Sequence, residues 1–424
     1  MRYNCGMKTS HTTGNPSSAI VAAETSRLMS LDALRGFDMF FIMGLPALII
    51  AVSNLVGLGE GWWLPQQMKH VEWHGWHLMD GVFPTFLFVS GVSWPFSYAK
   101  RVGGGMSRGR ICLGILRRAA VLFALGLLCE GITHIDLGWT AFRYGSVLGR
   151  IGIAWGCAAL LYVFCGVRTR IAVAAAILIG YWLLLLFVQA PDAARLAAAP
   201  PATKEIGNII AKYGGTGPWS LTGCLAGWFD RTLLVGRLRF PGILDTQGTL
   251  STLPAICLPA FGMLAGEFVR RTDISGRTKV LRMLGAAAGL ALAGWTLAHW
   301  LGSWSMPFNR SIWTSSHIMW SSGYALALFA VFYWLLDVKM WRRWAFFFRV
   351  IGMNAIAIWM ATRLYGVGPY GKFDPLRGAA NWLFGGVAKL CPAEWGALVA
   401  ALGYVAVCWG MLYFLYRKGI FFRA

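Results

Sequence analysis

The sequence predicts an all-α fold, a polytopic transmembrane helical bundle of about 10 to 11 spans with both termini in the cytoplasm. Three observations support this prediction. Hydrophobic residues make up 57% of the 424 residues and charged residues only 13%, with a mean hydropathy of +0.57, which is unlike an ordinary soluble enzyme. The apolar residues gather in segments of membrane-spanning length. The basic residues cluster in alternate connections between those segments.

Ten segments are apolar over the roughly 17 to 25 residues that a membrane-crossing helix needs. In chain order they cover about 36–56, 78–99, 111–130, 146–166, 170–190, 249–269, 280–301, 314–336, 344–366 and 395–416. A shorter, Gly-rich stretch at 378–390 predicts a re-entrant or surface helix, and it raises the count to eleven if it crosses.

The basic residues predict the orientation of these spans. Lys and Arg are concentrated after even-numbered spans and at the C-terminal end, near 100–118, 168–170, 270–282, 339–349 and 417–423. By the positive-inside rule these connections are cytoplasmic, so residues 57–77 lie on the extracytoplasmic side. The same rule accounts for most of the net charge of +21, which leaves nucleic-acid binding little to explain.

The chain divides into a leader and one membrane domain. Residues 1–26 are polar, lack the apolar core of a signal peptide, and predict a disordered N-terminal leader. Residues 27–424 predict a single transmembrane domain with extracytoplasmic loops at 191–248 and 367–394. Loops of this length are where a lid or an acceptor site is expected. The sequence has no internal repeat, which counts against a secondary transporter.

Several ionisable or amide residues fall within the predicted spans. A charge at membrane depth is costly, so such residues usually face the interior of a bundle and pair with one another. The competing interpretation is an ion pair that anchors a helix at the membrane surface, since Asp32 and Arg35 are three residues apart. The predicted polar interior comprises Asp32, Arg35, Asp38, Glu130, Arg150, Glu267 and Asn354.

The stretch "KHVEWHGWHLMDGVFP", residues 69–84, contains three of the seven histidines and two carboxylates. Three interpretations stay open. His70, His74 and His77 share one face if the segment is helical, and could then bind a metal such as zinc. The histidines and tryptophans could instead form an interfacial belt. Finally, one histidine could act as general base or nucleophile with a carboxylate to orient it, and Asp80 is well placed for that role.

Seven blocks, in order, resemble the heparan-alpha-glucosaminide N-acetyltransferase family and its bacterial relatives of uncharacterised domain type. The blocks begin near residue 27 and agree in order, spacing and residue type. They are "RLMSLDALRGFDMFFIM", "KHVEWHGWHLMDGVFPTFLFVSGVS", "ILRRAAVLFALG", "YGSVLGRIGIAW", "LDTQGTLSTLPAICLPAFGMLAGE", "PFNRSIWTSSHIMWSSGYAL" and "GMNAIAIW".

The resemblance implies a transmembrane acyltransferase that moves an acetyl group from cytoplasmic acetyl-CoA to an extracytoplasmic amino sugar or glycan. The family's H-x-x-W-x-G histidine corresponds to His70, and its following Asp corresponds to Asp80. His74 and His77 stand where relatives carry other residues, so the resemblance implies one working histidine and no metal. Further resembling positions are predicted to bind the acceptor, although turn and cap chemistry also explains them: Asp245, Gln247, Asn309 and Trp313.

The resemblance leaves the chemical route open. His70 could take a proton from the acceptor as it attacks the thioester, or could itself be acetylated and pass the group on. We expect a bacterial inner-membrane location with His70 on the periplasmic side. The expected partners are membrane lipid, acetyl-CoA, and an amino sugar or cell-envelope glycan, with a homodimer allowed and no nucleic acid. A transporter of a glycan or small molecule on the same fold is the alternative function.

Overall fold

The computed structural model describes residues 28–131, 142–201, 203–364 and 375–422, and these ranges are dominated by helices. No strand is formed within them. The only β-type pairings there are two isolated bridges, Arg143 with Gly236 and Phe240 with Leu244. The prediction of an all-α fold is therefore confirmed for the described part of the chain.

Seven helical segments are long and apolar enough to cross a membrane, and two bent helix pairs raise the number to nine if each pair is one span. The chain is accordingly a multi-pass integral membrane protein. The count of ten or eleven spans and the cytoplasmic termini stay predictions. The seven are α7 (Arg108–Gly131), α8 (Val147–Phe164), α9 (Val167–Phe187), α13 with α14 (Thr252–Ala255, Cys257–Arg270), α15 (Gly276–His299), α16 with the following π-helical turn (Ser315–Tyr333, Trp334–Val338) and α20 (Ala393–Arg417).

Both bent pairs turn by 61° at a single residue. In the first, α2 (Met29–Met43) ends at Gly44, whose φ of 148° lies outside the range that other residues readily adopt, and α3 (Leu45–Leu55) follows. In the second, α17 (Phe346–Met353) and α18 (Ala355–Leu364) are separated by Asn354. Hydropathy predicts one continuous span over each pair because it does not register a local bend.

The predicted span 78–99 is divided between α5 (Leu78–Val92) and α6 (Trp94–Gly103), which have 15 and 10 residues. A proline in the first turn of α6 starts a new helix there. The apolar stretch predicted at 378–390 forms α19 (Pro375–Leu390), whose 16 residues fall outside the candidate spans.

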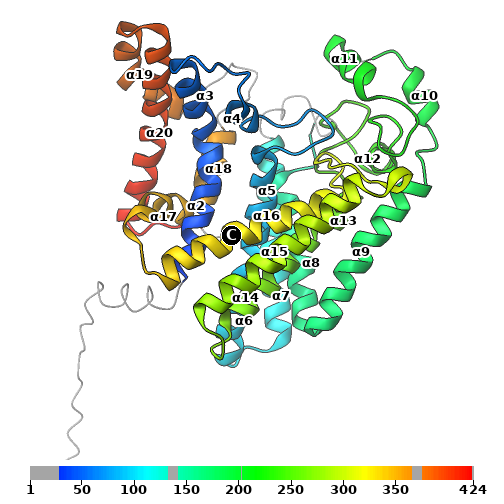
Figure 1. Cartoon of the computed structure of the whole chain (residues 1–424), viewed down its shortest axis with the longest axis horizontal. Coiled ribbons are helices and arrows are strands. Elements are labelled where there is room, and N and C mark those ends of the chain that lie inside the picture. The colour runs from blue at the N-terminus through cyan, green and yellow to red at the C-terminus, as the bar shows by residue number, and fades with distance from the viewer. Residues whose placement is uncertain (1–27, 132–141, 202, 365–374, 423–424) are drawn as a thin grey trace, which may run out of the picture.

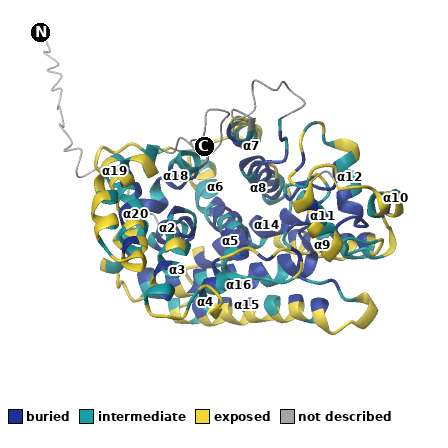
Figure 2. Ribbon diagram, turned by 90° about the horizontal axis from the view of Figure 1, so that it is seen from above, coloured by how far each residue is buried: buried dark blue, intermediate teal, exposed yellow. Residues whose placement is uncertain are grey.

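The buried interior consists of α8, α14 and α16, together with α2 and α5. More than half of the apolar window of α8, α14 and α16 is buried, against 22% for α7 and α20. Figure 2 shows the same division, with the exposed faces of α15, α19 and α20 at the periphery. The peripheral helices therefore present their apolar surfaces outward, as lipid-facing helices do.

The crossing of α5 and α14 needs glycine. A Cβ added to Gly91 would lie 2.1 Å from the carbonyl oxygen of Pro259, and one added to Gly262 would lie 2.0 Å from that of Phe88. Small residues allow two membrane helices to bring their backbones into contact. This close contact fixes the position of α5.

The two ends of the bundle differ in character. The predicted connection 191–248 contains α10 (Ala193–Ala198), α11 (Lys204–Tyr213) and α12 (Leu225–Leu233), which lie at the end of the molecule opposite the α6–α7 and α14–α15 turns (Figure 1). We call the end with α10, α11 and α12 the loop end. We call the end with the α6–α7 and α14–α15 turns the basic end, because those turns carry the Lys and Arg that predict cytoplasmic connections.

The loop that follows α3 is anchored at the loop end. It contains the short helix α4 (Trp63–Gln67), and its Trp73 is buried in an apolar cluster with Leu221 and Leu225. The indole N–H of Trp73 also donates to the carbonyl oxygen of Trp219 at 2.8 Å. The loop is therefore packed against the segment around α12 before it enters α5.

Candidate active site

The candidate site lies where this loop meets α5. Residues 70–77 are not helical, and α5 begins only at Leu78. The Asp80 carboxylate accepts the backbone N–H of His77 at 3.0 Å and that of Val71 at 3.3 Å. A carboxylate in the first turn of a helix can pair with amides that the helix leaves without partners. These contacts fix Asp80 and fold the loop over it.

His70 is the loop residue that Asp80 orients. Its Nδ1 lies 2.7 Å from Oδ1 of Asp80. The Asp80 side chain is fully buried, whereas 44% of the His70 side chain is exposed. A carboxylate at this distance favours the tautomer with hydrogen on Nδ1, which leaves the lone pair of Nε2 for a substrate. The pair has the arrangement of an oriented general base or nucleophile.

Arg310 is a third member of the site that the sequence analysis missed. Its Nε lies 3.1 Å from Oδ1 of Asp80, so the arginine and His70 share one carboxylate oxygen. Burial lowers the pKa of Arg310 from its ordinary value, and the nearby Asp80 opposes that change. The signal that could have found it is a charged residue inside "PFNRSIWTS", the block that opens α16.

The other two histidines of the stretch have different roles. His77 points its Nδ1 at the carbonyl oxygen of Lys69, 2.8 Å away, and His74 packs edge-on against Trp73. Burial lowers the pKa of His74. Because residues 70–77 are not helical, the shared helix face that a metal site would need does not exist. Within the described ranges, no three His, Cys, Asp or Glu side chains gather as a metal-binding group would require.

Glu72, the second carboxylate of the stretch, ties the loop to α11. Its Oε2 accepts from Lys212 Nζ at 2.6 Å and from the hydroxyl of Tyr213 at 2.8 Å. These two hydrogen bonds lower the pKa of Glu72. All three groups are on the surface, so Glu72 tethers the loop rather than facing His70.

Asp245 and Gln247, predicted to bind the acceptor, gather around Arg143. Asp245 accepts from Nε of Arg143 at 2.7 Å and from Nη2 at 2.8 Å, and Gln247 accepts from Nη2. Glu130 completes the cluster at 3.2 Å from Nη1. Every oxygen of Asp245 is thus engaged, and the residue is buried. The structure shows these residues organising the loop end; their contact with an acceptor stays a prediction.

Asn309 and Trp313 frame the turn that carries Arg310. The side-chain oxygen of Asn309 accepts from the backbone N–H of Ser311 at 2.8 Å, which is the turn chemistry considered as its alternative role. Trp313 is buried and has a φ of 51°, a conformation that costs free energy in a non-glycine residue. Its ring packs on Phe83 at 5.0 Å, one turn along α5 from Asp80. Trp313 therefore packs against α5 one turn from Asp80.

The predicted polar interior is only partly assembled as expected. Asp32 and Arg35 form the predicted pair at 3.5 Å, and Asp38 is buried with an Oδ2 that has no hydrogen-bond partner among the described residues. Arg150 lies over the ring of Trp313, 4.7 Å away. Asn354 instead binds the C-terminal segment, accepting from the N–H of Phe422 and donating to the carbonyl of Ile420, both at 3.1 Å.

A basic aromatic cluster lies on α6, α7 and α8, beyond the end of α5 that is far from Asp80. The guanidinium of Arg118 lies 4.1 Å from the ring of Trp155, and that of Arg101 lies 5.5 Å from the ring of Trp94. The two tryptophan rings are 5.2 Å apart. Arg35 on α2 interacts electrostatically with Arg118. Two guanidinium groups thus lie over a pair of indole rings, with a third arginine nearby.

An apolar pocket separates this cluster from the candidate site. It is lined by Phe83 and Phe86 of α5, with residues of α2, α8 and α18. Phe83 is the residue on which Trp313 packs, so the pocket begins one turn along α5 from Asp80. The remaining lining residues are Met39, Ile42, Val82, Val147, Leu148, Ile151 and Trp359.

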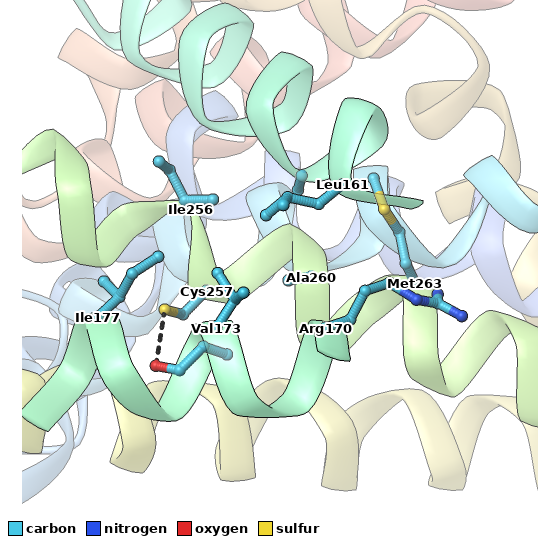
Figure 3. Close-up of a pocket in the computed structure, with 10 residues that line it drawn as sticks. Leu161, Arg170, Val173, Ile177, Ile256, Cys257, Ala260 and Met263 are labelled. Carbon is cyan, nitrogen blue, oxygen red and sulfur yellow. Dashed lines mark hydrogen bonds between the residues drawn. The ribbon is translucent and has the colours of Figure 1, made fainter. Parts of the chain in front are cut away.

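A second pocket lies between α8, α9 and α14 (Figure 3). It is almost entirely apolar, with the thiol of Cys257 directed at the carbonyl oxygen of Ala174 at 3.7 Å. Arg170 borders it, and its guanidinium binds Glu267 at 2.7 Å and stacks over Tyr162. His70, Asp80 and Arg310 are not among the residues that line this pocket.

Fold and site together define a class: an all-helical, multi-pass membrane protein with a carboxylate-oriented histidine at one end of the bundle. No protein-family model matches the chain. It is similar to the heparan-alpha-glucosaminide N-acetyltransferase of Homo sapiens, with 25% identity over 379 residues, and to that of Mus musculus, with 26% identity over 373 residues. Each match covers 82% of this chain and 55% of the relative, so the chain spans about half the length of the curated relatives it matches. These matches support the family relationship suspected from the sequence blocks.

Proposed function

We propose that the chain is a transmembrane acyltransferase that takes an acetyl group from acetyl-CoA and transfers it to an amino sugar or glycan at the loop end. The observation that carries the proposal is the His70–Asp80 pair. Nδ1 of His70 lies 2.7 Å from Oδ1 of Asp80, and the His70 ring is half-exposed. A positioned general base of this kind contributes about 100- to 10,000-fold to a rate. The similarity to two heparan-alpha-glucosaminide N-acetyltransferases supports the reaction class.

In this reaction Nε2 of His70 accepts a proton from the acceptor amine or hydroxyl as that group attacks the thioester carbonyl carbon. The new bond to the carbonyl carbon forms and the carbon–sulfur bond breaks, and the His70 imidazolium gives the acceptor's proton to the departing sulfur, so that coenzyme A leaves as its thiol. Asp80 stabilises the imidazolium that forms, and Arg310 contacts the same carboxylate oxygen. In the alternative route, Nε2 attacks the thioester itself and acetyl-histidine passes the group to the acceptor.

The donor is proposed to lie along the bundle between the basic aromatic cluster and His70. Its phosphates match Arg118 and Arg101, because guanidinium groups form strong charge-assisted hydrogen bonds with phosphate. The apolar pocket that Phe83 and Phe86 line would then receive the pantetheine arm.

Two helix faces support such a path. On α2, Met39 of the pocket follows Arg35 of the cluster by four residues, and Ile42 of the pocket follows Met39 by three. The three residues therefore share one helix face. On α8, Trp155 of the cluster and Ile151 of the pocket are four residues apart. The cluster and the pocket are therefore successive levels of the same helices. With the basic end in the cytoplasm, as the charge pattern predicts, acetyl-CoA would enter from that side and His70 would face the periplasm of a bacterial inner membrane.

The test uses the purified full chain in detergent with radiolabelled acetyl-CoA and a panel of amino sugars and cell-envelope glycans. We expect the wild type to release coenzyme A and label an acceptor, and His70→Gln to lose that activity. His299→Gln is the matched control, because His299 is exposed at the end of α15 and stacks only on aromatic rings. A wild type that neither binds acetyl-CoA nor releases coenzyme A would refute the proposal and leave transport as the function to pursue.

A further inference from the structure

His317 is a buried histidine that the mechanism above does not use. It is the third residue of α16, and its backbone N–H donates to the side-chain oxygen of Thr314, the N-cap, at 3.4 Å. Only 1% of the residue is exposed, and neither ring nitrogen has a hydrogen-bond partner among the described residues. Buried polar atoms are nearly always paired in folded proteins, and an unpaired one lowers stability. An imidazole with both nitrogens unpaired therefore needs an explanation.

Its position connects it to the candidate site. The His317 ring lies 6.1 Å from the ring of Trp313, which packs on Phe83 one turn from Asp80. His317 also interacts electrostatically with both Asp80 and Arg310. His317 is therefore within electrostatic range of Asp80 and Arg310, with its ring directed toward that of Trp313.

The segment that carries His317 is held rigidly. The backbone N–H of Asn309 donates to the side-chain oxygen of Thr314 at 3.0 Å, and the N–H of Thr314 donates to the carbonyl oxygen of Asn309 at 3.1 Å. These two bonds close the turn that holds Arg310 and Trp313, the latter with its φ of 51°. Backbone strain of this kind persists where surrounding contacts enforce it, and it is common at functional sites. Arg310 and His317 are thus fixed relative to each other.

The neighbouring histidines cannot take this place. His77 already uses its Nδ1 on the carbonyl of Lys69, and His74 packs edge-on against Trp73. His317 alone, among the histidines of the described ranges, is fully buried beside the site.

We infer that His317 is a second substrate-contacting imidazole, whose N–H donates to the carbonyl oxygen of the acyl donor. This inference rests on the proposed acyl transfer. When the acceptor attacks the thioester carbon, the carbonyl oxygen gains negative charge, and it returns to a carbonyl when the carbon–sulfur bond breaks. A fixed donor in a water-excluded position stabilises that charge, and removing one such donor typically costs about 100- to 1,000-fold in kcat. His70 then moves the proton while His317 binds the oxygen.

The experiment separates this role from ordinary core packing. His317→Phe keeps a ring of similar size without polar atoms, so it removes an unpaired buried imidazole from the folded protein. We expect kcat for coenzyme A release with glucosamine to fall about 100- to 1,000-fold, with the Kd for acetyl-CoA unchanged within a few fold. The thermal midpoint should be equal to or higher than that of the wild type. His317→Gln, which keeps an N–H donor, should recover part of the lost kcat.

The outcomes are distinct. A core residue predicts a lower thermal midpoint for His317→Phe and an unchanged kcat for the folded fraction, and that result would overturn the inference. So would equal loss of kcat in the Phe and Gln variants, or failure of both Phe and Ala variants to fold. His299→Phe, at an exposed histidine, is the control and should leave kcat unchanged. If the wild type itself transfers no acetyl group, the proposed function fails and this inference fails with it; an active wild type with an active His317→Phe variant refutes only the inference.

Discussion

Replacing Asp80 by Asn removes one negative charge from the centre of the site and changes the volume of the side chain little. The Asn side-chain oxygen can still accept from the backbone N–H groups of His77 and Val71, which lie 3.0 and 3.3 Å from the carboxylate. The start of α5 should therefore survive. What is lost is the charge shared by His70 and Arg310, at 2.7 and 3.1 Å.

Two magnitudes follow from that geometry. Without the carboxylate, His70 has no group that selects the tautomer with a free Nε2, so we expect kcat to fall by about 100- to 10,000-fold, the contribution of a positioned base. Arg310 is left without its partner, although 30% of its side chain is exposed. We expect that to cost about 1 to 3 kcal/mol in the free energy of unfolding, the usual penalty for a buried group that loses its partner.

The assay compares Asp80→Asn with Asp80→Ala. Coenzyme A release from acetyl-CoA gives kcat, and the thermal midpoint in detergent gives the relative stability. Both variants should lose activity to a similar extent. The Ala variant should be less stable by roughly a further 1 kcal/mol, because it also removes the acceptor for the first-turn amides. The reasoning is refuted if Asp80→Asn keeps kcat within about threefold of the wild type, a change too small for an orienting carboxylate.

Three further predictions concern charged groups outside the His70–Asp80 pair. Burial raises the pKa of Asp230 to about 6, above the roughly 3.9 of an Asp in the unfolded chain. The stability that Asp230 contributes is therefore complete below about pH 4 and is lost as the pH rises through 6. Asp230→Asn should reduce the fall in thermal midpoint over that pH range. Glu72→Ala breaks only exposed contacts with α11, and should leave kcat and thermal midpoint nearly unchanged, so a large loss of either would contradict its role as a surface tether. Arg118→Met should raise the Kd for acetyl-CoA by roughly tenfold to a hundredfold, whereas the exposed neighbour Arg117→Met should not, and equal effects in both would remove the basic aromatic cluster from the donor path.

Hydropathy and charge predict most of the fold because they report what the membrane requires of each segment. The long apolar segments that form α7, α8, α9, α15 and α20 are visible in this way. A break inside an apolar run is not visible, because Gly44 and the start of α6 change the backbone direction without changing hydrophobicity. That is why the predicted span 78–99 is two shorter helices in the structure.

The sequence predicts those candidate-site residues that lie close together along the chain. Residue type and the position of Asp80 at the head of an apolar segment predicted one histidine oriented by that carboxylate, and the family resemblance singled out His70. Arg310 is far along the chain, and only tertiary packing brings it to Asp80. The same limit applies to Asp245, which the family resemblance suggested as an acceptor-binding residue, because its partner Arg143 comes from a different segment. The zinc hypothesis assumed a helix over 70–77, but α5 begins at Leu78, where Asp80 supplies the first-turn contacts.

The central claim is that acetyl groups move from acetyl-CoA to an acceptor through His70, and the most direct measurement is sided transfer in proteoliposomes. Radiolabelled acetyl-CoA is placed on one side of the membrane and glucosamine on the other, and the labelled product is counted on the acceptor side. We predict labelled product with the wild type and with His299→Gln, and none with His70→Gln. Equal labelling by His70→Gln and the wild type, or none with any of the three, would contradict the claim.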